Sequence, residues 1–244
     1  MIHGWPDSYR LWDGQVAVLK ERYRCVRFTL PGFDLGPKRA YALDEIIATV
    51  RRVIEQTSPQ QKVTLLLHDW GCFMGYQFAL RHPELVERVI GVDIGGDAGT
   101  RAHRTELGAR GLFMVLAYQL WLALAWKIGG RIGDAMARAM ARMLRCPTDQ
   151  SAIGAQMGYT YAMRWFGVAG GFPGVRTFEP QVPMLYVYGE RKPLMFHSRA
   201  WVERVAARPG NRVVPFATGH WVMVTAREKF NAELLAWLGE SRAN

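Results

Sequence analysis

The residues best suited to chemistry lie in the run LHDWG at positions 67–71. An apolar segment, 63–67, leads into this run, and a helical pattern begins near Cys72. A sharp turn between a strand and a helix would lift the side chain of Asp69 above a sheet, as in a nucleophile elbow. A carboxylate there can attack an electrophilic carbon and form an alkyl ester, which water then hydrolyses with the help of a base. Asp69 is therefore the candidate nucleophile.

The same aspartate has a simpler interpretation, because Asp is a common N-cap residue of helices. Three further segments favour the catalytic one. HGWP lies at positions 3–6, LPGF follows a strand-like segment at 30–33, and GHW lies at 219–221. Together with the elbow, and in this order, these segments resemble the α/β-hydrolase superfamily over nearly the whole chain. HDWG resembles the epoxide hydrolase and haloalkane dehalogenase branches of that superfamily.

The resemblance assigns the base that activates water to His220 in GHW, and imidazole titrates near neutral pH, as this role requires. The acid that orients this histidine usually follows the penultimate strand. Here that position is Lys192, which cannot accept a hydrogen bond from imidazole. Asp93, at the end of another predicted strand, matches the acid of some haloalkane dehalogenases, and we prefer it to Glu190 and Asp97. The alternative for Asp93 is a helix cap.

The resemblance also implies hydrogen-bond donors around the nucleophile. The backbone N–H groups of Trp5 and Trp70 would hold an oxyanion or a leaving group, and the indole of Trp70 would hold a departing halide. Epoxide hydrolases use lid tyrosines to donate to the ring oxygen, and Tyr161 is the first candidate here, with Tyr159 and Tyr118 as others. Simple packing is the alternative role for each of these aromatic residues.

The elements that must position these residues alternate along the chain. Strands are predicted over 23–30, 63–67, 89–94, 184–188 and 212–216, and helices over 43–56 and 227–238. This alternation predicts an α/β fold with a mostly parallel sheet and helices on both faces. Only Met1 and Ile2 precede HGWP, where family members have further strands. We therefore expect the N-terminal strands to be missing and one sheet edge to be unpaired.

From about 98 to 180 the strand pattern stops and helix-forming residues dominate. We expect residues 98–180, called the lid segment below, to form a helical lid on a core built from 1–97 and 181–244. Within it, the apolar stretch 111–126 is shorter than the ~20 residues that a membrane-spanning helix needs. Basic residues flank this stretch. We favour a helix buried over an apolar pocket, and the alternative is peripheral contact with a membrane.

Composition narrows the remaining classes of function. A chain of 244 residues, half of them hydrophobic, can bury a substantial core. The net charge of +10 comes without a nucleic-acid-binding motif, so we expect a small apolar substrate and no nucleic acid as a partner. Three widely spaced cysteines indicate free thiols in a reducing compartment, and the absence of a signal-peptide pattern favours the cytoplasm. The expected chemistry needs neither a metal nor an organic cofactor.

These features predict a hydrolase that forms an ester on Asp69 and hydrolyses it with water activated by His220. An epoxide hydrolase is the first choice, because of HGWP, GHW and the lid tyrosines. A haloalkane dehalogenase is second, supported by Asp93 and by Leu67, a bulky aliphatic residue two positions before the nucleophile. The third alternative is a catalytically silent relative that binds a lipophilic ligand or a partner, since Lys192 occupies the usual acid position.

Overall fold

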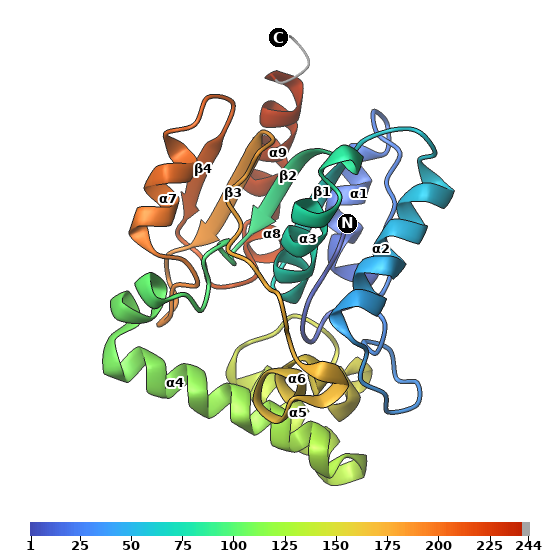
Figure 1. Ribbon diagram of the computed structural model, residues 1–244, viewed down its shortest axis with the longest axis vertical. Helices are drawn as coiled ribbons and strands as arrows, with labels where there is room; N and C mark the ends of the chain where they lie inside the picture. The colour runs from blue at the N-terminus through green and yellow to red at the C-terminus, as the bar shows by residue number, and fades with distance from the viewer. Residues whose placement is uncertain (241–244) are drawn as a thin grey trace.

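The computed structural model describes residues 1–240, which form a four-stranded sheet with helices on both faces (Figure 1). The strands are β1 Val63–His68, β2 Val86–Val92, β3 Met184–Gly189 and β4 Arg212–Phe216. They lie in the order β1-β2-β3-β4, and all three pairings are parallel. The predicted α/β fold is therefore confirmed.

Two hydrophobic layers cover the sheet. The helices are α1 Asp13–Leu19, α2 Leu43–Thr57, α3 Trp70–Arg81, α4 Arg101–Ile128, α5 Gly130–Met143, α6 Tyr159–Phe166, α7 Arg199–Ala206, α8 Val222–Thr225 and α9 Arg227–Glu240. Successive residues of β1 point to opposite faces: Leu65 and Leu67 pack in the layer of α2, α3 and α7, whereas Leu66 packs with α1, α8 and α9. The sheet is therefore buried on both sides, as a parallel sheet requires.

The segment 23–30 does not form a strand, so that part of the sequence prediction is wrong. A strand needs a neighbour along its length, and only the start of the chain lies between this segment and β1. The amino group of Met1 donates to the carbonyl oxygen of Val26 at 2.8 Å, and Ile2 forms a single bridge with Leu67 of β1. One bridge cannot hold a whole strand in register.

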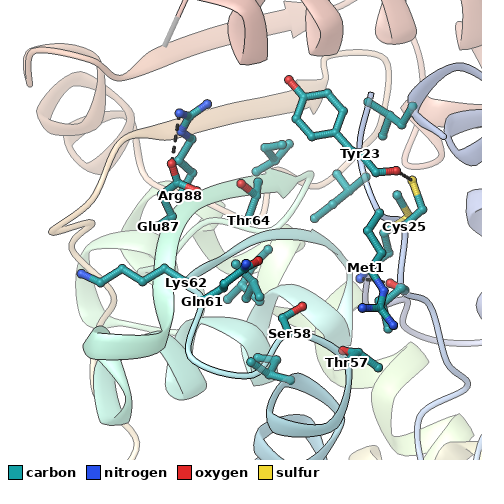
Figure 2. A pocket seen from close by; sticks show the side chains of 18 of the residues that line it. Met1, Tyr23, Cys25, Thr57, Ser58, Gln61, Lys62, Thr64, Glu87 and Arg88 are labelled. Atoms are coloured by element: carbon teal, nitrogen blue, oxygen red, sulfur yellow. Dashed lines mark hydrogen bonds and ion pairs between the residues drawn. The ribbon is translucent and has the colours of Figure 1, made fainter. Parts of the chain in front are cut away.

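An open groove of about 610 Å³ lies where this sheet edge is unpaired (Figure 2). It is lined by residues of the segment 22–28, of β1 and of helices α2 and α9. None of the candidate site residues lines it. This groove is therefore separate from the predicted chemistry.

The lid segment contains α4, α5 and α6, which lie together at one end of the molecule (Figure 1). The helix α4 bends at Gly108, where φ is 62°. Among the described residues, it is the one helix that is long and apolar enough to cross a membrane by length and composition alone. Only 22% of its most apolar 18-residue window is buried, so the prediction of a buried helix over 111–126 is wrong. Apolar periodicity does not distinguish a face packed inside a protein from a face exposed at its surface.

Candidate active site

Asp69 occupies a sharp turn between β1 and α3. Its backbone has φ 52° and ψ −124°, in a region that residues other than glycine rarely adopt. Its side chain makes no capping hydrogen bond to α3. Instead, Oδ1 accepts a hydrogen bond from the backbone N–H of Trp5 at 2.7 Å. The turn thus presents the carboxylate above the sheet, and the helix-cap interpretation does not hold.

Two glycines allow the HGWP turn to approach the elbow closely. A Cβ atom at Gly4 would collide with the carboxylate of Asp69. A Cβ atom at Gly71 would lie 2.6 Å from the carbonyl oxygen of His3. Without side chains at these two positions, the backbone of Trp5 comes near enough to donate to the candidate nucleophile.

The charge of Asp69 is kept although the residue is buried. Burial raises the pKa of this carboxyl group, but hydrogen bonding and charge from His220, together with a backbone hydrogen bond from Trp70, bring the pKa below its ordinary value. Of the two backbone donors predicted from the sequence, Trp5 donates to Oδ1 of this carboxylate, and the N–H of Trp70 contributes to its low pKa. An ionised carboxylate with one oxygen held by N–H groups is suited to act as a nucleophile.

His220 lies between two carboxylates. Its Nδ1 atom is hydrogen-bonded to Oδ2 of Asp93, and its Nε2 atom lies 3.6 Å from Oδ2 of Asp69. Burial by itself lowers the pKa of His220, but Asp93 and Asp69 raise it to about 9. Of the three acids weighed from the sequence, the structure brings Asp93 to the imidazole, whereas Asp97 accepts the backbone N–H of Ser198.

Lys192 contacts the acid rather than the imidazole. Its ammonium group donates to Oδ1 of Asp93 at 2.5 Å and to the carbonyl oxygen of Gly189 at 2.7 Å, and its side chain is only 7% exposed. The N–H of Gly189 donates to the same Oδ1 at 2.9 Å, which leaves Oδ2 for His220. Burial raises the pKa of Asp93, but His220 and Lys192 bring it below its ordinary value. The sequence did not reveal this contact, because Lys192 and Asp93 are 99 residues apart.

Comparison with known proteins shows the family to which this chain belongs. The sequence profile described as the alpha/beta hydrolase fold matches residues 1–226. The chain belongs to the α/β-hydrolase fold family. The resemblance recognised in the four sequence segments is therefore confirmed.

Named relatives of this α/β hydrolase match it over a shorter stretch. "Epoxide hydrolase 1" of Caenorhabditis elegans is 36% identical over 93 residues, which are 36% of this chain and 23% of that protein. "Probable oxidoreductase EphD" of Mycobacterium tuberculosis is 38% identical over 93 residues, or 16% of its length. The matched stretches thus span less than a quarter of these two relatives. The fold matches that of a Bacillus megaterium epoxide hydrolase crystallised with an inhibitor, with a TM-score of 0.73, 19% identity, and coverage of 98% of this chain and 92% of that one.

Two of the three lid tyrosines lie near the elbow of the hydrolase. The ring of Tyr161 is centred 6.1 Å from that of Trp5 and 5.3 Å from that of Trp70, and Tyr118 of α4 is 6.1 Å from Tyr161. Burial raises the pKa of both phenols, and the negative charge of Asp69 raises both further. Both hydroxyl groups therefore remain protonated donors at neutral pH.

Tyr159 is placed differently. Its ring packs against Phe33 at 5.7 Å and Tyr41 at 5.9 Å between ring centroids. Its buried hydroxyl group has no hydrogen-bond partner among the described residues. Tyr159 thus belongs to an aromatic cluster beside the LPGF turn and not to the group around Trp70.

A buried carboxylate behind the candidate base joins three loops. Asp7 accepts hydrogen bonds from the indole N–H of Trp221, at 2.9 Å, and from the hydroxyl group of Thr148 in the lid segment. Burial raises the pKa of Asp7 to about 6. The Nε2 atom of His68 lies 3.2 Å from the carbonyl oxygen of His220. These contacts hold the loop of His220 from behind.

Proposed function

We propose that this α/β hydrolase opens epoxides through a covalent ester on Asp69. The arrangement around its carboxylate carries the proposal: Oδ1 is held by the N–H of Trp5, and Oδ2 faces His220. In the first step Oδ2 attacks an epoxide carbon, and the bond between that carbon and the ring oxygen breaks. The ring oxygen takes a proton from the hydroxyl group of Tyr161 or Tyr118, and Oδ1 becomes the carbonyl oxygen of the ester.

Water hydrolyses the ester in the second step. His220 takes a proton from the water, which attacks the carbonyl carbon of the ester, and Asp93 stabilises the imidazolium that forms. Negative charge develops on Oδ1, where the N–H groups of Trp5 and Trp70 hold it. Cleavage of the bond between the acyl carbon and the alkyl oxygen then releases the diol, whose new hydroxyl group takes its proton from the imidazolium. The acid proton left on Asp69 passes to the tyrosinate formed in the first step, which restores the carboxylate and the phenol.

Formation of the ester also prepares the base. Two carboxylates hold the proton on His220 in the free protein. Esterification makes Asp69 neutral and removes one of them, so the pKa of His220 falls in the intermediate. Neutral imidazole thus becomes available at the step that needs it.

The lid tyrosines favour epoxides over haloalkanes. An epoxide oxygen leaves as an alkoxide and needs a proton donor, which Tyr161 and Tyr118 supply, whereas a halide leaves without a proton. The surroundings of Asp69 are aromatic: the ring of the adjacent Trp70 stacks on that of Phe172, with 5.7 Å between the ring centroids. We therefore propose a small apolar epoxide as the substrate, which agrees with the names of several relatives.

One observation favours haloalkanes as a second candidate substrate class. The indole N–H of Trp5 is buried without a hydrogen-bond partner among the described residues, and its ring packs beside Tyr161. A free N–H donor in an apolar site is suited to hold a departing halide. Release of halide from bromoalkanes, measured beside diol formation from epoxides, distinguishes the two classes.

The test of the ester route is a single turnover in ¹⁸O-labelled water with the protein in excess over an aryl epoxide. We expect the diol to carry unlabelled oxygen from the carboxylate, and the peptide that contains Asp69 to gain the label. Mass spectrometry of the diol and of the peptide reads both outcomes. Label in the diol of the first turnover would mean that water attacks the epoxide directly, and the proposal would be wrong.

A second prediction concerns Lys192. Changing Lys192 to Met removes a positive charge from Asp93, so Asp93 should hold the proton on His220 more strongly. The pKa of His220 in the ester intermediate should rise. Since hydrolysis needs neutral imidazole, the acidic limb of its pH profile should move upward by about one unit. Decay of the ester, followed in single turnovers across the pH range, measures this shift.

The matched control is Lys62→Met, which replaces a lysine with methionine at the open groove, away from the candidate site. It should leave the pH profile in place. An unshifted profile in Lys192→Met would show that Lys192 does not tune the base.

A further inference from the structure

The helix α4 exposes an apolar face along most of its length. Between Leu112 and Ile128, the exposed apolar residues are Leu112, Phe113, Leu116, Ala117, Trp121, Leu124 and Ile128. Most of them recur every three or four positions and lie on one side of the helix. We call these residues the apolar strip. Phe113 and Ile128, near its two ends, are 69% and 54% exposed. At 1.5 Å per residue, the strip is about 24 Å long.

The opposite side of α4 is fixed in the protein. Leu122, Ala123 and Ala125 are buried there. At the edge of the strip, the indole N–H of Trp121 donates to the carbonyl oxygen of Met136 in α5 at 2.9 Å. A helix attached in this way cannot pass through a bilayer without losing its contacts with the lid segment. It can instead lie along a surface with its apolar side outward.

Basic residues lie at both ends of the strip, and their positive charge favours an anionic partner. The helix α4 begins with three exposed arginines before the strip, and two exposed basic residues lie at its other end: Arg101, Arg104, Arg110, Lys127 and Arg131. Glu106 is the one acidic residue over 101–131, and its carboxylate accepts the backbone N–H of Arg199 at 2.9 Å. An apolar strip with cationic ends complements an anionic lipid surface.

The position of α4 leaves this face accessible. Figure 1 shows α4 along the outer edge of the lid segment, with α5 and α6 between it and the sheet. A second copy of the chain is the main competing occupant. A symmetric contact between two such strips would bring their cationic ends close together, which disfavours it.

We propose that the apolar strip docks on an anionic membrane surface, with α4 parallel to the bilayer plane. Its apolar side chains lie at the boundary of the acyl chains, and the flanking arginine and lysine side chains reach the lipid phosphates. This docking is independent of the chemistry at Asp69, so failure of either proposal leaves the other in place.

The test is co-sedimentation of the full chain with vesicles of phosphatidylcholine, alone or mixed with phosphatidylglycerol. We expect binding to the mixed vesicles, weakened at least fivefold when salt is raised to about 0.5 M. Leu124→Glu places a charge in the middle of the strip and should lower the affinity at least about tenfold. Ala236→Glu, the matched control on an exposed position of α9, should bind as the unmodified chain does.

Circular dichroism checks that the variants fold, and Phe113→Ser is a milder second variant at a residue of the strip that is 69% exposed. Three results would overturn the proposal. The first is that the unmodified chain does not bind the mixed vesicles, and the second is that both strip variants bind them as well as it does. The third is a dimer in light scattering that Leu124→Glu converts to a monomer, which would assign the strip to a second copy.

Discussion

A variant with glutamine in place of His220 should stop at the ester on Asp69. Glutamine is polar and of similar reach, but it cannot take a proton from water. The first step needs only the carboxylate and the lid hydroxyl groups, so alkylation should continue. Turnover should fall by about 10³-fold, within the range for removal of a general base. The intact mass of the protein should rise by the mass of one epoxide.

The pH of this experiment follows from the electrostatics of the pair. His220 lowers the pKa of Asp69, whereas burial raises it. Without the imidazole, the pKa of Asp69 rises, so the variant should be alkylated at pH 8, where the carboxylate stays ionised. His82→Gln, at the surface end of α3, is the control and should keep its turnover. An adduct on a residue other than Asp69, or none with a broad set of epoxides, would contradict the ester mechanism.

The variant Asp69→Asn should lose both steps. An amide is a poor nucleophile, and loss of the nucleophile should lower turnover by about four orders of magnitude or more. The fold should survive, because Asn tolerates a positive φ and its oxygen can still accept the N–H of Trp5. Rates of diol formation and thermal unfolding curves measure the two effects separately.

The pKa of His220 is a second quantity that the Asp69→Asn substitution should change. Asp69 is one of the two carboxylates that raise the pKa of His220 to about 9. In Asp69→Asn that pKa should therefore fall, as measured by NMR. Asp34→Asn, an exposed position after the LPGF turn, is the control and should change neither rate nor pKa. Diol formation at the unmodified rate in Asp69→Asn would exclude Asp69 as the nucleophile.

The sheet could be predicted where a strand is buried on both faces. The run 63–67 is almost wholly apolar, and Leu65 and Leu67 pack in one helix layer while Leu66 packs in the other, so the sequence itself carries the signal. The segment 23–30 also contains several apolar residues, with Arg24 and Arg27 among them, but within residues 1–240 no strand lies beside it to pair with. Pairing depends on a neighbour, and composition does not report whether that neighbour is present.

Some residues of the candidate site could be predicted from local sequence, and others could not. Asp69, His220 and the HGWP turn lie in short segments that are recognisable by themselves. Asp93 could be chosen only through the family resemblance, and Lys192 only when its contact with Asp93 is seen. Such contacts join residues 99 or more positions apart, and no local pattern encodes them.

Asp7 links the lid segment to the loop that carries His220. Thr148 belongs to the lid segment and Trp221 adjoins His220, yet both donate to this one buried carboxylate. Displacing Thr148 would leave a buried acceptor short of a partner, at a cost of about 1–3 kcal/mol. The end of the lid segment near Thr148 is therefore tied to the core through Asp7.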